Sequence, residues 1–466
     1  MVGSVDESGS LFSGREILAI GWVALTTVVA LNVIVRWTNG GLIDKIQGAT
    51  PTYWPISIFT FRLDRLRPAW AIGATVAAIA VFVLAGVYCR RRKSEIAPVV
   101  AAGLLLLGLS NLVHGFDHGF VAPLATRQGY YQLAPGITDP LAFVRTYEAN
   151  QLSYVVHART HPPGAVLTFT LLDRLFGSRA LISAAIALVS LPASSFLLYR
   201  LVGTYYEREV AWYVTVLFVL LPAVQIYFLA SLDAIIATLM LGTVYFFTRE
   251  SRLALVGAFA CLVVVSFQMF LFVLLLPVLA AVAVRRHEKR VPFAAIVLGL
   301  VGWYLYVDVA LGYDYLDSFV LASNQQNPGG FLLTAKPAWY VYTRLEDVAE
   351  LALFFTPFLC LLALRGARAL RRDVLGGGGW LPGNAREREP LVIASAAIGS
   401  FAALLVAGVY HTGETARGAM YLYPFLLLPV AAALRRIAPD ERERWLLAAA
   451  VFGQSLLMQL VGGYLW

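Results

Sequence analysis

The chain has 466 residues, of which 59% are hydrophobic and only 14% are charged. Soluble domains carry about 25% charged residues, so this composition excludes an ordinary soluble protein. The net charge of +8 does not indicate nucleic-acid binding, because the basic residues lie in short connectors between apolar runs, where cytoplasmic loops carry them.

Apolar runs of about 20 residues recur along the chain, and each is long enough to cross roughly 30 Å of hydrocarbon. The sequence therefore predicts an all-α, polytopic protein of the cell membrane with about 13 transmembrane helices. The expected spans are 16–37, 69–88, 96–114, 180–200, 210–224, 229–248, 253–267, 270–284, 292–311, 346–366, 390–409, 418–436 and 445–464. The segment 162–178 is too short to cross and carries Asp173 and Arg174, so we expect a helix at the interface, started by Pro162-Pro163 and ended by Gly177.

The spans fall into four regions. These are two N-terminal spans in 1–95, a membrane core over 96–374 with large loops at 115–178 and 312–345, a Gly-rich flexible linker at 375–389, and a three-span unit at 390–466. Lys and Arg collect on the cytoplasmic side of membranes, so the basic connectors and the linker are predicted to be cytoplasmic. The large loops then lie on the extracytoplasmic face.

Ionisable side chains gather in the loops of this outer face, which makes them candidates for a functional site. The first loop ends in the motif Arg159-Thr-His161-Pro-Pro-Gly164 and also contains Asp117, His118, Asp139 and Glu148. Later loops and the start of one span add Asp233, Lys336, His411, Glu414 and Arg417. The three cysteines have no paired spacing, so neither a disulfide framework nor a zinc site is indicated.

These residue types fit one kind of chemistry, although each also has a structural interpretation. A carboxylate at a membrane face can act as a general base for a hydroxyl, and nearby Arg or Lys can hold a phosphate. A groove between spans can hold a lipid tail. Against this, Asp139 before Pro140 is typical of a helix N-cap, Asp233 can also cap a helix, and Glu414 with Arg417 can form a local ion pair.

The stretch from His161-Pro-Pro-Gly through Leu-Leu-Asp-Arg-Leu-Phe-Gly-Ser and Leu-Leu-Tyr-Arg-Leu-Val-Gly to Leu-Leu-Pro-Ala-Val-Gln and Asp233 resembles the protein mannosyltransferase and lipid A aminoarabinose transferase superfamily. These proteins have the GT-C fold and use lipid-phosphate sugars. The resemblance covers about 110–250 and is weaker around Glu414–Arg417. Two spans precede the superfamily's first helix here, and the Asp-Glu pair that often marks its first loop is absent.

The resemblance implies an inverting, extracytoplasmic glycosyltransferase whose donor is a polyprenyl-phosphate sugar and whose acceptor is a glycan, lipid or protein hydroxyl. It implies a base in the first loop, for which Asp139 is narrowly preferred over Asp117, with Glu148 a further candidate. Arg159, Lys336 and Arg417 would bind the donor phosphate, and the other predicted substrate contacts are His118, His161, Asp233, His411 and Glu414. A divalent cation is compatible with the superfamily, which contains metal-dependent and metal-independent members.

Three other interpretations use the same residues. A non-catalytic transporter or flippase for lipid-linked sugars would use the cationic groove without a base, and it predicts charged residues deep inside several spans. The sequence indicates few of these. A scaffold for cell-envelope enzymes predicts freely replaceable loop charges, and an ion channel is disfavoured because no span shows a polar stripe.

Overall fold

A computed structural model describes residues 11–37, 59–61, 67–91, 95–326, 329–376, 385–409 and 414–464. This part of the chain is helical apart from one antiparallel pair of three-residue strands, β1 (Phe59–Phe61) and β2 (Gly462–Tyr464). Five of the described helices are long and apolar enough to cross a membrane, or six if one bent pair counts as a single span. The architecture is therefore compatible with a polytopic membrane protein, while the number of about 13 spans and the GT-C arrangement stay predictions.

The described helices and turns occur in the following order along the chain. The first part contains α1 (Gly14–Trp37), α3 (Pro68–Arg90), α4 (Ala97–Asn111), the turns η2 (Asp117–Val121), η3 (Ala122–Ala125), η4 (Tyr130–Gln132) and η5 (Ala134–Gly136), α5 (Pro140–Asn150), η6 (Gln151–Ser153), α6 (Val156–Arg159), α7 (Gly164–Phe176), α8 (Arg179–Val202), α9 (Arg208–Leu220), α10 (Pro222–Tyr227) and α11 (Leu232–Thr248). The second part contains α12 (Arg252–Ser266), η7 (Phe270–Leu274), α13 (Leu275–Arg285), η8 (His287–Lys289), α14 (Arg290–Leu311), α15 (Tyr315–Gln326), α16 (Leu332–Ala335), α17 (Pro337–Phe355), α18 (Pro357–Gly376), α19 (Ala385–Ala407), α20 (Thr415–Gly418), α21 (Tyr423–Ile437) and α22 (Glu441–Val461).

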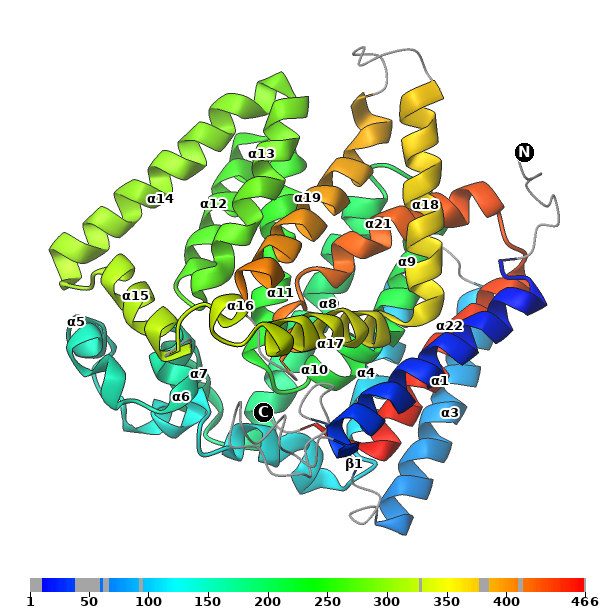
Figure 1. Ribbon diagram of the computed structural model, residues 1–466, viewed down its shortest axis with the longest axis horizontal. Coiled ribbons are helices and arrows are strands. Elements are labelled where there is room, and N and C mark those ends of the chain that lie inside the picture. The colour runs from blue at the N-terminus through cyan, green and yellow to red at the C-terminus, as the bar shows by residue number, and fades with distance from the viewer. Residues whose placement is uncertain are drawn as a thin grey trace.

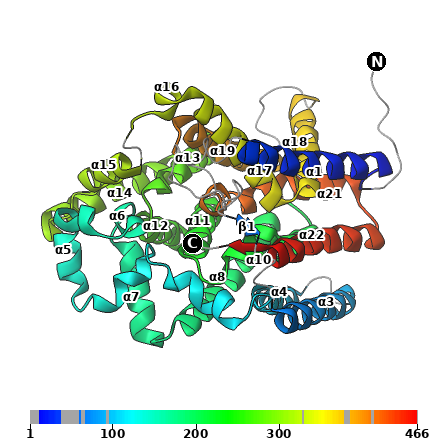
Figure 2. The same cartoon turned by 60° about the horizontal axis from the view of Figure 1, so that its bottom comes forward.

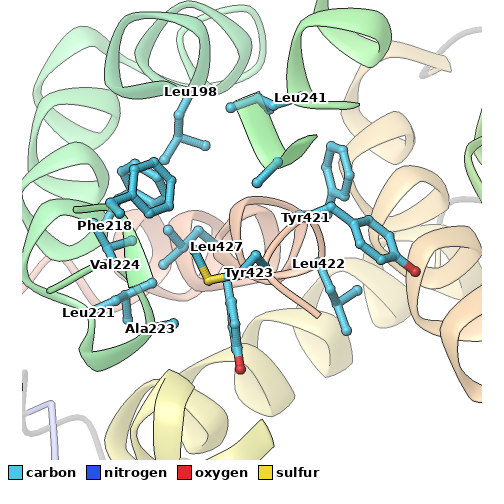
Figure 3. Packing of buried hydrophobic residues seen from close by; sticks show 14 of the residues in the cluster. Leu198, Phe218, Leu221, Ala223, Val224, Leu241, Tyr421, Leu422, Tyr423 and Leu427 are labelled. Atoms are coloured by element: carbon cyan, nitrogen blue, oxygen red, sulfur yellow. The ribbon is translucent and has the colours of Figure 1, made fainter. Parts of the chain in front are cut away.

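The arrangement places a central group of helices between two flanks. α12, α13 and α14 lie on one side and α1, α3 and α22 on the other, while α5, α6 and α7 of the first large loop lie together at one end (Figures 1 and 2). The central core is built from α8, α9, α11 and α21, whose apolar side chains are buried against one another. Figure 3 shows Leu198, Phe218 and Leu427 of this core pointing toward a shared interior.

A glycine allows a close approach between α18 and the core helix α21. A Cβ added to Gly366 of α18 would lie 1.7 Å from the carbonyl oxygen of Pro429 in α21. Only a residue without a side chain lets the two backbones approach this far, as small residues do in membrane helix pairs. Gly366 thereby holds α18 against α21, the helix that follows the α20 turn.

The predicted interfacial segment forms a helix with the expected bounds. α7 begins after Pro162-Pro163 and ends at Gly177, whose φ of 61° is left-handed and therefore suits glycine. Its 13 residues extend about 20 Å, which is too short to cross the hydrocarbon. Its position at the membrane interface stays a prediction.

The predicted span 346–366 is not a continuous helix, and this corrects the sequence interpretation. α17 and α18 meet at an angle of 94° at Thr356, which has a φ of 73°. Pro357 explains the break, because a proline disfavours helical backbone in the preceding residue and cannot continue the hydrogen-bond ladder. The part of this segment that lies in α17 contains Glu346, Asp347 and Glu350, all with 0% exposure.

The predicted linker 375–389 is also shorter than expected. Residues 377–384 lie outside the described part of the chain, whereas 385–389 form the start of α19. Glu389 is buried there and pairs with Arg286 at 2.5 Å, and Tyr205 donates a hydrogen bond to it. Partners that are distant in sequence therefore order this end of the linker.

Candidate functional site

A small pocket forms where the first large loop meets the start of α11 and the α20 turn. Asp233 and Arg417 both line it and lie 3.6 Å apart, and we call it the Asp233–Arg417 pocket. Its lining consists of Pro123, Leu124, Thr126, Gly129, Tyr130, Tyr131, His157, Phe169, Ala230, Ser231, Leu232, Asp233 and Arg417. The cavity volume of about 40 Å³ has room for a few water molecules.

Local structure fixes the Asp233 carboxylate in this pocket. Ser231 caps α11 by accepting the Asp233 backbone N–H at 2.9 Å, and its hydroxyl donates to the Asp233 carboxylate at 2.8 Å. The carboxylate therefore lies in the first turn of α11, where the helix dipole favours negative charge. The Nε of Arg417 lies 3.6 Å from Oδ2 of Asp233, so the two form an ion pair rather than a short hydrogen bond.

Two histidines of the first loop lie beside the same aromatic ring. The ring centroid of Tyr130 is 5.7 Å from that of His157 and 5.2 Å from that of His161. Burial, with Arg417 nearby, lowers the pKa of His157 to about 3 and that of His161 to about 4. Both imidazoles are therefore neutral at physiological pH and can form hydrogen bonds without adding positive charge beside Arg417.

The Arg159–Gly164 motif is held in place by contacts from several elements. The Tyr147 hydroxyl donates to the backbone carbonyls of Ala158 and His161. Nδ1 of His161 donates to the carbonyl of His157 at 3.0 Å, which leaves Nε2 as the unprotonated nitrogen of the neutral ring. At Gly164, an added Cβ would lie 2.2 Å from the carbonyl oxygen of Phe267 at the end of α12. The motif's glycine is thus needed for the close approach of two backbones.

The two carboxylates that sequence analysis ranked first do not line this pocket. Asp139 is exposed and caps α5, accepting the backbone N–H groups of Leu141 at 2.9 Å and Ala142 at 3.0 Å. This is the structural role weighed against catalysis in the sequence. Asp117 is exposed at the start of the π-turn η2 and lines neither this pocket nor the neighbouring one.

The remaining predicted site residues are divided between the pocket and the surface. His161 contacts the pocket residue Tyr130, and Glu414 immediately precedes the α20 turn that carries Arg417. His118 lines a second small pocket with His114 and Gln459. Three others are not lining residues of the first pocket: Glu148 accepts the Asp314 backbone N–H at 3.3 Å, Arg159 is half-buried in α6, and Lys336 is exposed before α17. His411 lies outside the described residues.

Sequence reasoning did not select four residues that the structure brings to this region. Tyr130 and His157 line the pocket, and Asp347 and Glu350 of α17 contact the turn that bears Arg417. The missed pattern was the presence of acidic residues inside the predicted span 346–366, since ionisable residues at membrane depth are functional candidates. Tyr130 and His157 had no comparable local pattern.

Neither a metal site nor a comparison with known proteins assigns a function to the pocket. Within the described ranges, no group of three or more His, Cys, Asp and Glu side chains has an arrangement that would hold a metal ion. Comparison with models of protein families and with curated protein sequences finds no match to this chain. Functional inference therefore depends on the residues of the pocket and their surroundings.

Proposed function

We propose that the chain is an integral-membrane glycosyltransferase that moves a sugar from a polyprenyl-phosphate donor to a hydroxyl of a glycan, lipid or protein. The observation that supports this best is the Asp233–Arg417 pair, because it combines a carboxylate suited to proton abstraction with a guanidinium suited to phosphate. The sequence resemblance to lipid-phosphate-sugar transferases points to the same chemistry. In this proposal the site lies on the extracytoplasmic face of the cell membrane.

The ion pair suggests how donor binding prepares the site. A donor phosphate is a stronger partner for Arg417 than a carboxylate at 3.6 Å, so it would draw the guanidinium away from Asp233. Asp233 is then free to accept the proton of the acceptor hydroxyl. The hydroxyl oxygen forms the new bond to the anomeric carbon while the bond from that carbon to the phosphate oxygen breaks. The phosphate leaves with the electron pair, and Arg417 stabilises its charge.

The other pocket residues would bind and enclose the sugar. Tyr130 stacks on Phe169 with ring centroids 5.9 Å apart, which gives the pocket an aromatic wall, and neutral His157 supplies a hydrogen-bonding group. Ligand pockets usually enclose about 300–1,000 Å³. The present cavity is far smaller, so we expect the first loop and the α20 turn to separate when a donor binds.

In this proposal the base is Asp233 rather than Asp139 or Asp117. Asp139 is occupied as a helix cap, and Asp117 lies outside both small pockets. The test is a transfer assay with the purified full chain, radiolabelled polyprenyl-phosphate sugars and lipid or glycan acceptors. Label that moves from donor to acceptor supports the proposal. An intact donor with every sugar and acceptor offered contradicts it.

Transport of lipid-linked sugars is a second candidate, because one observation favours it. Sequence analysis found the predicted spans nearly free of charge, but Glu346, Asp347 and Glu350 are buried in a segment predicted to cross the membrane. Buried carboxylates of this kind are common in transport pathways. Proteoliposomes separate the two functions: a transporter moves intact donor between leaflets, whereas a transferase cleaves the bond between sugar and phosphate.

A further inference from the structure

We propose that Asp347 and Glu350 of α17 are positioning residues, which hold the α20 turn so that Arg417 points into the Asp233–Arg417 pocket. The inference adds to the proposed function, on which its catalytic part rests, and its structural part can be tested without any transfer assay.

α17 has a polarity that is inverted relative to a helix of a soluble protein. Val341, Leu345 and Val348 are exposed by 54%, 64% and 57%, whereas Asp347 and Glu350 have no exposure. An apolar cavity of about 620 Å³ lies between this outward side, α18 and α1. Such a helix presents its apolar side to lipid and its acidic side to the protein interior. The buried carboxylates are therefore directed at something inside the protein.

Each of these carboxylates accepts a hydrogen bond from α20. Oε1 of Glu350 accepts the backbone N–H of Ala416 at 2.8 Å, and Oδ1 of Asp347 accepts the hydroxyl of Thr415. Arg344, one turn earlier on α17, pairs with Oδ2 of Asp347 at 2.9 Å and donates to the carbonyl of Leu405 at the end of α19. Two carboxylates from one helix thus bind the two residues that directly precede Arg417.

The α20 turn needs such contacts because of its length. It contains only the four residues Thr415–Gly418, and a single helical turn is unstable alone, since nucleating it fixes several backbone angles for one hydrogen bond. The N–H groups of a helix start also have no partner within the helix. Glu350 supplies one for Ala416, and therefore fixes the backbone from which the Arg417 side chain extends.

The cost of burying two carboxylates also indicates that Asp347 and Glu350 serve the Asp233–Arg417 pocket rather than stability alone. Burying a carboxylate removes it from water at a large cost, and replacing buried ion pairs with apolar residues often stabilises proteins. Asp347 and Glu350 reach α20 through acceptor oxygens, and Arg344 offsets part of their negative charge by pairing with Asp347. Loss of either carboxylate should leave Arg417 present but wrongly oriented.

The structural part is tested by hydrogen exchange on the purified full chain. Glu350→Ala removes the acceptor for the Ala416 N–H, and Thr415→Val removes the hydroxyl that Asp347 accepts at nearly constant volume. We expect at least tenfold faster exchange in the peptide that contains 415–418 in both variants. Two matched controls should exchange like the wild type: Thr415→Ser keeps the hydroxyl, and Val348→Ala alters the opposite face of α17. Unchanged exchange in both test variants would overturn the inference.

The catalytic part is tested with the same proteins in the transfer assay. A misplaced Arg417 should raise KM for the donor at least tenfold with a smaller change in kcat, and Glu350→Gln should restore much of the loss because its carbonyl can still accept the N–H of Ala416. A purely structural role would instead lower the amount of active protein at unchanged KM. If the wild type transfers no sugar, the proposed function fails while the exchange result still decides whether α17 positions α20.

Discussion

Two carboxylates at helix starts, Asp139 and Asp233, have nearly the same local setting and different surroundings. Asp139 caps α5 and is exposed, and its Oδ1 accepts the backbone N–H groups of Leu141 and Ala142 in its own helix. Asp233 lies in the first turn of α11, where Ser231 is the cap, and its carboxylate is left to face Arg417 from a distant part of the chain. A carboxylate that is itself the cap is held by its own helix, whereas a carboxylate beside a serine cap can pair with a distant cation.

The largest effect is expected at the cation of the pair. Arg417→Ala removes the proposed phosphate ligand and leaves Asp233 without its ion-pair partner, so transfer efficiency should fall about 10²–10³-fold. Arg417→Lys keeps the charge but loses the planar fork of donors. Its transfer efficiency should therefore lie between those of the wild type and Arg417→Ala. The measurement is kcat/KM for the donor. Equal efficiencies of the alanine variant and the wild type would remove Arg417 from the site.

The next largest effect is expected on stability, from a substitution at Gly164 in the Arg159–Gly164 motif. Gly164→Ala places a methyl group against the carbonyl of Phe267, and relieving that clash should destabilise the fold by about 1–3 kcal/mol. Gly136→Ala is the control in the same loop, since a Cβ there meets nothing within 4 Å. Thermal unfolding in detergent compares the two. A Gly164→Ala protein as stable as the control would show that the motif's glycine has another role.

The neutral histidines of the loop predict a dependence of stability on pH. The pKa values of His157 and His161, about 3 and 4, lie below the unfolded value of about 6.5, so the unfolded chain binds more protons between these limits. The contribution of these two histidines to the free energy of unfolding is complete above about pH 6.5. It is lost as the pH falls toward 4, by up to about 1.4 kcal/mol per pH unit for each histidine.

This pH dependence is read from unfolding midpoints between pH 7 and 4.5. His161→Gln should lose less stability over that interval than the wild type, because glutamine does not titrate. Identical slopes for the two proteins would mean that His161 is protonated in the folded state. His157→Gln provides an independent repeat at the second histidine.

The smallest effect is expected at the exposed cap. Asn caps helices about as well as Asp, so Asp139→Asn should leave stability nearly unchanged, whereas Asp139→Ala should cost about 1 kcal/mol. Neither substitution should change transfer more than about twofold, because Asp139 contacts no pocket residue among those described. A hundredfold loss of activity in a stably folded Asp139→Asn protein would mean that Asp139, and not Asp233, is the base.

Local patterns were sufficient to predict the parts of the fold that depend on neighbours in sequence. The apolar runs, the α7 helix between Pro162-Pro163 and Gly177, and the alternative of Asp139 as a cap all follow from short-range rules. The 94° bend between α17 and α18 was missed because the apolar run continued through Thr356 and outweighed the proline that follows it. The helical start of α19 was missed because its partner, Arg286, is distant in sequence.

The candidate site was predicted only in part, for a related reason. His161, Asp233 and Arg417 are predicted as isolated polar residues; the structure places Asp233 and Arg417 in one pocket and His161 against the pocket residue Tyr130. Hydropathy gives no distance between loops, so it could not distinguish Asp233, which meets Arg417, from Asp139, which meets only its own helix. It likewise could not show that the carboxylates of α17 contact the α20 turn.

The central claim is that the carboxylate paired with Arg417 is the base, and one comparison of three isosteric variants tests it most directly. Transfer from a radiolabelled polyprenyl-phosphate sugar is measured for Asp233→Asn, Asp139→Asn and Asp117→Asn, each checked for equal folding. We expect a loss of about 10²-fold or more in Asp233→Asn alone, the range that general base catalysis supplies. An active Asp233→Asn protein beside an inactive Asp117→Asn or Asp139→Asn protein would contradict it.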